Sequence, residues 1–446
     1  MAVELDAEEI KMGESPKTVL KVLVEQKHWT YRDFNDHFEA AARRLGVKGN
    51  LTVSEAQFRR WTSGKIQSSP AAETCRVLQD MFGISAEQLF MAPSTDAPAP
   101  AFNLEAEIDM TAREAQTEAG AAASASISDT AVEQLRDDVH RLARRYNALP
   151  PFEVLRTARA LREDIEQHRD RTQVPIQQQE LLILAGQACA ILSTAAFDLG
   201  SFEGATRLAR SAALYGETAR FEPLRAFAGG TLAYIAYFSG RPADAAQYAR
   251  RAAMLPGLGD IAHRRLSAIE ARAYGHLGDV ASAQRALTMS ADAGDGSRDE
   301  LHDDVGGEFG FSDERLAMSN GSTCLLLKDG PQAEAAAERA LELVSARPPA
   351  ARSLAVVGGA AADLATARLM RGDLDGAAHA LTQVWDVPMD QRATGLLARA
   401  RQVRRSLTDL RFREAPLAAE VGERLEHFAR GAQTQVGHSS VAALES

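Results

Sequence analysis

"ILSTAAFDLGSFEGATRLARSAALYGE", residues 191–217, contains the pattern that decides the fold of most of this chain. An apolar helical run ends at Gly200, and a second helical run carries Ala205 five residues later. Glycine readily adopts the left-handed conformation that ends a helix, and a small alanine lets a second helix approach the first closely. The stretch therefore predicts a hairpin of two helices joined by a tight turn.

The same frame recurs four more times, at intervals of 40, 38, 52 and 42 residues. Glycine stands at residues 200, 240, 278, 330 and 372, and alanine stands at residues 205, 245, 283, 335 and 377. Five matches in one frame indicate stacked helical hairpins, which is the arrangement of an α-solenoid. Residues 132–169 form two more helical runs, split at Pro150 and Pro151, that we expect to start the array. The widest interval predicts an insertion.

Composition supports a helical fold for the whole chain. Of the 446 residues 45% are hydrophobic and 25% charged, as in an ordinary globular protein, and only 6% are aromatic. Alanine is abundant, and it is the strongest helix former. We therefore expect an all-α protein with two or three domains.

The charge of the chain is unevenly distributed. The whole sequence has a net charge of −11, yet residues 16–66 hold ten Lys and Arg against five Asp and Glu. A basic head on an acidic body confines attraction for phosphate to one end of the chain.

The basic segment contains four to five short predicted helices. In "SEAQFRRWTSGKIQSSP", residues 54–70, Ser54 caps a helix that turns Phe58 and Trp61 inward and that ends at Gly64. Arg59 and Arg60 then face outward. Such a layout is typical of helix-turn-helix DNA-binding domains. The alternative is that the two arginines only solvate a helix face.

This stretch resembles the recognition helix and following turn of the XRE family of transcriptional regulators. The residues that match the family pattern are Ser54, Phe58, Arg60, Trp61, Gly64, Lys65 and Pro70, and "FGISAEQLF" resembles the end of that domain. The resemblance implies that Glu55, Gln57 and Arg59 point toward base edges of duplex DNA. It also implies that Arg60, Thr62, Ser63 and Lys65 hold the DNA backbone, and it places Ser54 among the DNA-binding residues. Lys48, in the loop before this helix, is a candidate for a further phosphate contact.

The repeats resemble the tetratricopeptide (TPR) type, because residues 199–205 carry its "LG-x-F-x-x-A" turn. An XRE-type head followed by TPR-like repeats resembles actinobacterial regulators of differentiation and secondary metabolism. The resemblance implies a homodimer whose repeats sense a peptide, protein or small-molecule ligand. The alternative is a TPR interaction scaffold with a degenerate head, since Thr62 replaces a usual acid and the loop after Gly46 is long.

The expected domains follow from these patterns: a flexible N-terminus (1–14), a helix-turn-helix domain (15–90), a flexible linker (91–129), a TPR-like domain for sensing and dimerisation (130–435) and a polar tail (436–446). Candidate ligand-binding residues are Tyr234 and Tyr237, in the densest aromatic cluster, and Phe309 and Phe311, in "GEFGFS". For all four, packing in the core is the alternative. The acidic start of the insertion is expected to be a solvated loop rather than a metal site.

No signature of an enzyme is present in the sequence. We find no catalytic triad, no metal-ligand set and no phosphate-binding loop, so we expect no enzymatic activity, metal or cofactor.

Cys75, Cys189 and Cys324 fall in apolar helical patterns and are expected to be free thiols. No signal peptide or membrane span is recognisable, so we expect a cytoplasmic protein that does not enter a membrane.

Overall fold

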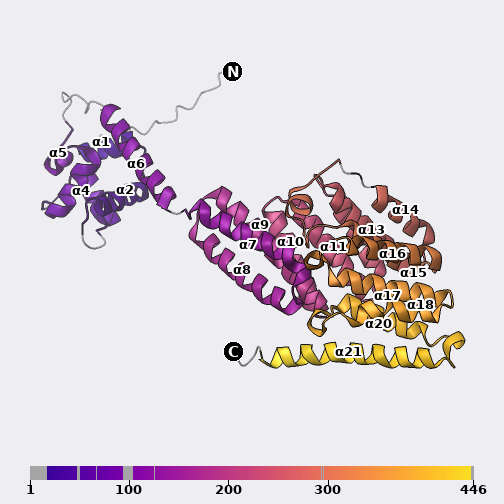
Figure 1. The fold of residues 1–446 in the computed structure, drawn as a ribbon. Coiled ribbons are helices and arrows are strands. Elements are labelled where there is room, and N and C mark those ends of the chain that lie inside the picture. The colour runs from indigo at the N-terminus through magenta and orange to yellow at the C-terminus, as the bar shows by residue number, and fades with distance from the viewer. Residues whose placement is uncertain are drawn as a thin grey trace, which may run out of the picture. The chain divides into compact units, whose positions relative to one another are not determined.

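The computed structural model describes residues 18–47, 51–66, 68–93, 104–124, 126–292, 294 and 296–442. All regular elements of this part of the chain are helices, which confirms the expected all-α fold (Figure 1). The chain divides into two compact units, Met1–Arg113 and Glu114–Ser446. The predicted flexible N-terminus, residues 1–14, lies outside the described residues.

Unit 1 is a bundle of five short helices. They are α1 (Val19–Gln26), α2 (Tyr31–Arg44), α3 (Glu55–Thr62), α4 (Ala72–Phe82) and α5 (Ala86–Phe90). Phe34 and Phe38 are fully buried at its centre, and Trp61 is only 4% exposed. The helices begin where the sequence predicts caps: Thr30 and Asp33 form a capping box at the start of α2. The sequence predicts four to five short helices here, and the structure has five.

A sixth helix, α6 (Leu104–Ser124), lies where a flexible linker was expected, at residues 91–129. The boundary between the two units falls within this helix, at Arg113. Its side chains are exposed wherever the structure describes them. The expectation of a segment without regular structure is therefore wrong for residues 104–124. Alanine and glutamate favour helix by their intrinsic propensity, which an analysis based on apolar periodicity does not detect.

Unit 2 contains the remaining helices. They are α7 (Asp129–Arg145), η1 (Tyr146–Ala148), α8 (Pro151–Arg171), α9 (Pro175–Asp198), α10 (Phe202–Thr218), α11 (Glu222–Phe238), α12 (Pro242–Ala253), α13 (Asp260–Leu277), α14 (Val280–Asp292), η2 (Glu300–Val305), α15 (Asp313–Leu326), α16 (Gly330–Ser345), η3 (Pro349–Ala351), α17 (Leu354–Met370), α18 (Leu374–Ala380), α19 (Thr382–Trp385), η4 (Met389–Gln391), α20 (Thr394–Ser406), η5 (Leu410–Phe412) and α21 (Pro416–Ala442). The predicted break at Pro150 and Pro151 separates α7 from α8. α21 extends into the predicted polar tail at 436–446.

Four of the five predicted hairpin turns have the expected geometry. The turn glycines Gly200, Gly240, Gly278 and Gly372 have φ values of 85°, 74°, 74° and 89°. The alanines five residues later, at 205, 245, 283 and 377, are at most 1% exposed. These turns pair α9 with α10, α11 with α12, α13 with α14, and α17 with α18. Unit 2 is therefore an array of helical hairpins.

In the fourth hairpin of the array the predicted register is two residues out. Lys328, not Gly330, adopts the left-handed conformation, with φ of 60°. Ala333 is fully buried, whereas Ala335 is exposed. The reason is local: the Asp329 carboxylate accepts a hydrogen bond from the Gln332 N–H at 3.1 Å and caps α16, which carries a proline in its first turn. This cap starts the helix at Gly330.

The first helices of successive hairpins lie against one another. α9 contacts α11, α11 contacts α13, α13 contacts α15, α15 contacts α17, and α17 contacts α20. The early and late parts of this layer also meet. Thr394 donates a hydrogen bond to the Asp198 carbonyl at 3.1 Å, and Ser353 donates one to the Asn147 side chain at 3.4 Å. The first helices of the hairpins therefore form a closed layer around the inner face of the array.

The insertion between α14 and α15 packs into the fold rather than lying in solvent. The Glu308 N–H donates to the Ala143 carbonyl at 2.9 Å, and Arg144 donates to the Val305 carbonyl at 3.1 Å. Asp299 and His302 are 6% and 2% exposed and lie 3.0 Å apart. The predicted solvated loop is therefore wrong for Asp299 and His302, although residues 296–298 and Asp304 are exposed. The Asp299 carboxylate can be buried because backbone N–H groups donate hydrogen bonds to it, including that of Gly259 at 2.9 Å.

One helix of the described chain, α9, is long and apolar enough to cross a membrane. However, 78% of its most apolar window is buried inside unit 2. Such burial is consistent with the core helix of a soluble protein.

Candidate functional site

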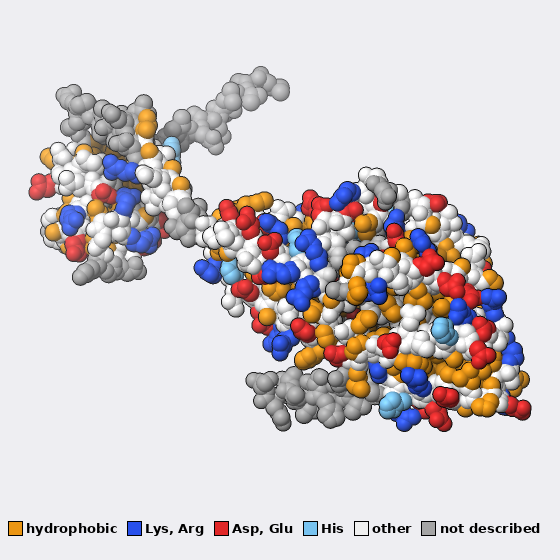
Figure 2. Space-filling view, in the orientation of Figure 1, with side chains coloured by type: hydrophobic (Ala, Val, Ile, Leu, Met, Phe, Trp, Pro, Cys, Tyr) orange, Lys and Arg blue, Asp and Glu red, His pale blue; other side chains and the backbone are white. Residues whose placement is uncertain are grey.

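The outer face of α3 in unit 1 is the first candidate site. Arg59, Arg60 and Lys65 are exposed there, and Glu55 forms an ion pair with Arg59 at 2.5 Å. The Arg60 Nε donates to the Ala56 carbonyl at 3.2 Å. Figure 2 shows Lys and Arg side chains exposed on this unit. The exposed charge of the helix is therefore positive.

The inner face of α3 fixes the helix on the bundle. The Phe58 ring lies 4.7 Å from that of Phe34, and the Trp61 ring lies 5.6 Å from that of Phe90. Just before the helix, Val53 accepts a hydrogen bond from the Tyr31 hydroxyl at 2.8 Å. Because α3 is held at both ends, its exposed side chains have a defined orientation.

The predicted DNA-contact residues are only partly brought together on this face. Ser54 is exposed and caps α3 by accepting from the Gln57 N–H at 3.3 Å, and Gln57 itself is half-buried. Ser63 is half-buried, and its hydroxyl donates to the Arg60 carbonyl at 3.2 Å. Lys48 lies outside the described residues.

Thr62 does not belong to the exposed face of α3. It is 9% exposed, and its hydroxyl donates to the Phe58 carbonyl at 3.0 Å. Its own carbonyl accepts a hydrogen bond from the Thr18 hydroxyl at 3.3 Å. The prediction that the Thr62 side chain holds a DNA backbone is therefore wrong, since the helix end packs against the start of α1.

The inner face of the helical array in unit 2 is the second candidate site. It contains two adjoining cavities with volumes of about 150 Å³ and about 680 Å³. Arg272 on α13 and Arg399 on α20 line both cavities. The volume of the larger cavity is in the range of small-molecule sites. We refer to the two cavities together as the groove.

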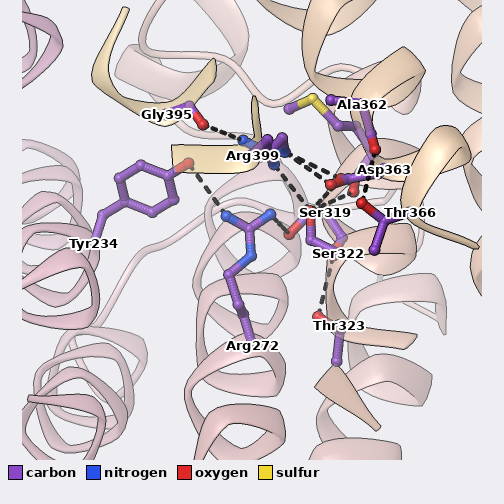
Figure 3. Close-up of polar contacts among 11 residues, drawn as sticks. Tyr234, Arg272, Ser319, Ser322, Thr323, Ala362, Asp363, Thr366, Gly395 and Arg399 are labelled. Carbon is purple, nitrogen blue, oxygen red and sulfur yellow. Dashed lines mark hydrogen bonds and ion pairs between the residues drawn. The ribbon is translucent and has the colours of Figure 1, made fainter. Parts of the chain in front are cut away.

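Two of the groove's arginines are neutralised by carboxylates. The Arg399 Nε lies 3.1 Å from both Asp363 carboxylate oxygens, and Ser322 donates to that carboxylate at 2.6 Å (Figure 3). Arg315 pairs with Glu308 at 3.0 Å. The Asp363 charge helps to raise the pKa of Arg399, although burial acts in the opposite direction. The Arg399–Asp363 pair joins helices that are 36 residues apart in the sequence, whereas Arg315 and Glu308 are only seven residues apart.

Two further arginines have no carboxylate within ion-pair distance in the described chain. Arg272 is 3% exposed and donates to the Tyr234 hydroxyl at 3.2 Å and to the Ser319 hydroxyl at 3.3 Å (Figure 3). Its Nε–H is buried without a partner. Arg265 donates to the Phe227 carbonyl and the Thr231 hydroxyl, both at 3.2 Å, and burial lowers its pKa to about 10. The Arg265 guanidinium is therefore charged at neutral pH.

Asp198 is the third carboxylate of the groove. It accepts a hydrogen bond from the Tyr146 hydroxyl at 2.7 Å. Burial raises the pKa of Asp198 to about 7 and also raises that of Tyr146. Burial alone would raise the pKa of Tyr234, but the charges of Arg272 and Arg399 lower it overall. The groove thus favours negative charge near Tyr234.

The structure separates the four predicted ligand residues. Tyr234 and Phe311 line the smaller cavity, and Tyr237 lines the larger one. Phe309 is fully buried, with its ring 4.9 Å from that of Phe227, so the prediction that it contacts a ligand is wrong. Phe309 instead anchors the insertion in the core.

Sequence reasoning missed the charged residues of the groove. Arg272 stands between Ala271 and Ala273, both fully buried, but the sequence pattern alone does not reveal this, because Arg159 also stands between two alanines and its side chain is 74% exposed. A cation flanked by buried small residues on a helix is unusual, since arginine is seldom buried unless paired. Among the described residues no group of three or more His, Cys, Asp or Glu gathers as metal ligands do. No protein-family model matches this chain, and no curated protein matches it.

Proposed function

We propose that the protein is a DNA-binding transcriptional regulator, in which unit 1 reads duplex DNA with α3 and unit 2 dimerises and senses a ligand. The observation that carries this proposal is the exposed face of α3, where Arg59 and Arg60 project from a helix fixed to the bundle and Lys65 is exposed in the turn that follows it. Cations on a rigid short helix suit the major groove, whose edges and flanking phosphates are negative.

Individual side chains of α3 have the chemistry for base recognition. Arginine donates two parallel hydrogen bonds to guanine, and glutamine pairs with adenine, which suits Arg59 and Gln57. The Arg59–Glu55 pair is exposed, and exposed pairs contribute only about 0–1 kcal/mol, so DNA can displace it. Arg60, Ser63 and Lys65 would hold the backbone. Thr62 is left out of the set because it is buried.

A homodimer follows from the small size of the head. One helix reads few base pairs, and regulators of this kind bind two half-sites with two copies. A ligand in unit 2 would change the separation of the two heads and thereby the affinity for the operator. A role in actinobacterial differentiation or secondary metabolism rests on resemblance alone. A cytoplasmic location agrees with the free thiols of Cys75, Cys189 and Cys324.

An electrophoretic shift assay with genomic fragments, including the chain's own upstream region, tests the proposal. The variant is Arg59→Ala combined with Gln57→Ala. The matched control is Arg207→Ala on α10, because Arg207 pairs with Glu203 at the same i, i+4 spacing and both arginine side chains are 76% exposed. We expect the variant to lose affinity about tenfold or more, from about 1–3 kcal/mol per base contact, and the control to bind as the native chain does.

The interaction scaffold with a degenerate head is the competing function. The long connection between α2 and α3 favours it, since residues 45–54 separate the two helices. Under that hypothesis no fragment is retained against competitor DNA, or retention is the same for the variant and the control. Either result refutes sequence-specific reading by α3.

A further inference from the structure

The charges around the groove of unit 2 are not balanced by the protein itself. Arg315 and Arg399 have carboxylate partners, Glu308 and Asp363. Arg265 and Arg272 have none among the described residues; Arg272 is 3% exposed and Arg265 is half-buried. Asp198, the remaining carboxylate, accepts its hydrogen bond from Tyr146 instead. The groove therefore holds an excess of positive charge.

Arg272 occupies a position that is unfavourable for a chain without a ligand. Its helix, α13, buries the neighbouring Ala271 and Ala273 completely, so the side chain starts from the interior. The two hydrogen bonds that it makes go to neutral hydroxyls, those of Tyr234 and Ser319. A buried ion without a counter-charge is strongly destabilising, and its unpartnered Nε–H adds to that cost. An apolar residue would fit the fold better.

We propose that the groove binds a small organic anion, with its carboxylate or phosphate group held by Arg272. The guanidinium fork matches the geometry of both acids, and the Ser319 and Tyr234 hydroxyls lie beside it to complete the cradle (Figure 3). Arg265, which lines the same smaller cavity, adds a second positive charge.

The apolar part of the ligand lies in the larger cavity. Arg272 lines both cavities, and the larger one has an apolar wall that includes Tyr237, Leu326 and Met370. Polar side chains, among them Lys328, Gln402 and Arg405, line the rest of it. Aromatic and aliphatic walls around a few polar groups are usual for small-molecule sites. The contact of Thr394 with Asp198 closes the layer of helices, which favours a compact ligand over an extended chain.

The neighbouring Arg399–Asp363 ion pair holds the residues of the proposed anion site in position but does not itself bind the anion. Ser322 lies one turn from Ser319 on α15, and its hydroxyl accepts from Arg399 at 2.9 Å while it donates to Asp363 at 2.6 Å. This network ties α15, α17 and α20 together, so Ser319 is held opposite Arg272. Asp363 neutralises the charge of Arg399, so Arg272 is the arginine that binds the acid group of the ligand.

The inference rests on the proposed sensing role of unit 2 but not on DNA binding by unit 1. The experiment contains no DNA, so the two can fail separately. The probes are benzoate, phenyl phosphate and the neutral analogue benzamide, at equal ionic strength. Isothermal titration and thermal unfolding of the full chain are measured for the native protein, Arg272→Met and Arg272→Lys. The control is Arg207→Met, which removes an exposed charge on α10.

We expect the native chain to bind at least one of the two anions and to be stabilised by it, with no effect of benzamide. Comparison of benzoate with phenyl phosphate identifies the preferred acid. Arg272→Met should weaken binding about 30-fold or more and leave the free protein as stable or more stable, because it removes an unpaired buried charge. Arg272→Lys should retain part of the affinity, and Arg207→Met all of it.

Three results overturn the proposal. The first is that neither anion binds the native chain, and the second is that benzamide binds as well as benzoate. The third is undiminished binding by Arg272→Met. If Arg272→Met does not fold, the comparison with benzamide and the Arg272→Lys variant still test the proposal. If Arg272 had only a structural role, neither the native chain nor Arg272→Lys would bind the anions.

Discussion

The close approach of the insertion to α7 makes Gly307 a critical position in unit 2. Its φ is 62°, and a Cβ there would lie 2.4 Å from the Ala143 carbonyl oxygen and 2.6 Å from the Arg144 Cα. These are backbone atoms that cannot rotate away. Gly307→Ala therefore forces the insertion off α7, which breaks the hydrogen bond from the Glu308 N–H to Ala143.

The expected loss of unfolding free energy for Gly307→Ala is about 3–5 kcal/mol. A non-glycine residue in the left-handed region costs about 1–2 kcal/mol. The backbone hydrogen bond of Glu308 contributes about 1 kcal/mol. The bond from the Arg144 guanidinium to the Val305 carbonyl involves a charged group and contributes about 1.5 kcal/mol or more.

Gly278→Ala is the matched control, because Gly278 has φ of 74° and no atom within 4 Å of the added Cβ. It should lose only the backbone term, about 1–2 kcal/mol. Urea unfolding of the full chain, followed by far-ultraviolet circular dichroism, measures both variants. Equal losses for the two, within about 0.5 kcal/mol, would refute the reasoning, since the insertion would then not be held against α7.

Two further predictions concern the groove and its surroundings. Burial raises the pKa of Asp198 to about 7 from an ordinary value of 3.8, so the folded state keeps a proton that the unfolded state loses. The free energy of unfolding of unit 2 should therefore fall as pH rises from about 4 to about 7. Asp198→Asn still accepts a hydrogen bond from Tyr146 but does not titrate, so unfolding measured across that pH range should no longer show the contribution of Asp198 to this fall. An unchanged pH profile would contradict the assignment. Phe309→Ala should cost about 3–5 kcal/mol in urea unfolding, because Phe309 is fully buried, whereas Phe311→Ala should cost clearly less; the reverse order would show that the insertion packs differently.

The helical hairpins were predictable because their signals are local. A glycine that ends a helix and an alanine at the close contact act within a few residues, so Gly200 and Ala205 identify their turn without knowledge of the rest. The register error at Gly330 has the same origin. Two local signals competed there, and the cap formed by Asp329 prevailed over the glycine.

The second site was only partly predictable for the opposite reason. Tyr234 could be proposed from its aromatic cluster, but nothing near Arg272 in the sequence indicates Ser319, its partner 47 residues away. Likewise Arg399 and Asp363 are 36 residues apart. Whether a charge is neutralised depends on such distant neighbours, and the pattern of one helix does not contain them.

The sequence by itself determined that the chain is helical, that most of it is an array of hairpins, and that residues 16–66 carry a net positive charge although the whole chain is acidic. Local preferences of glycine, alanine and capping residues are sufficient for those conclusions. Only the tertiary structure decided that Phe309 is core, that Thr62 faces inward and that Arg272 lacks a counter-charge. Burial and pairing depend on contacts between residues distant in sequence, and those contacts exist only once the helices have packed.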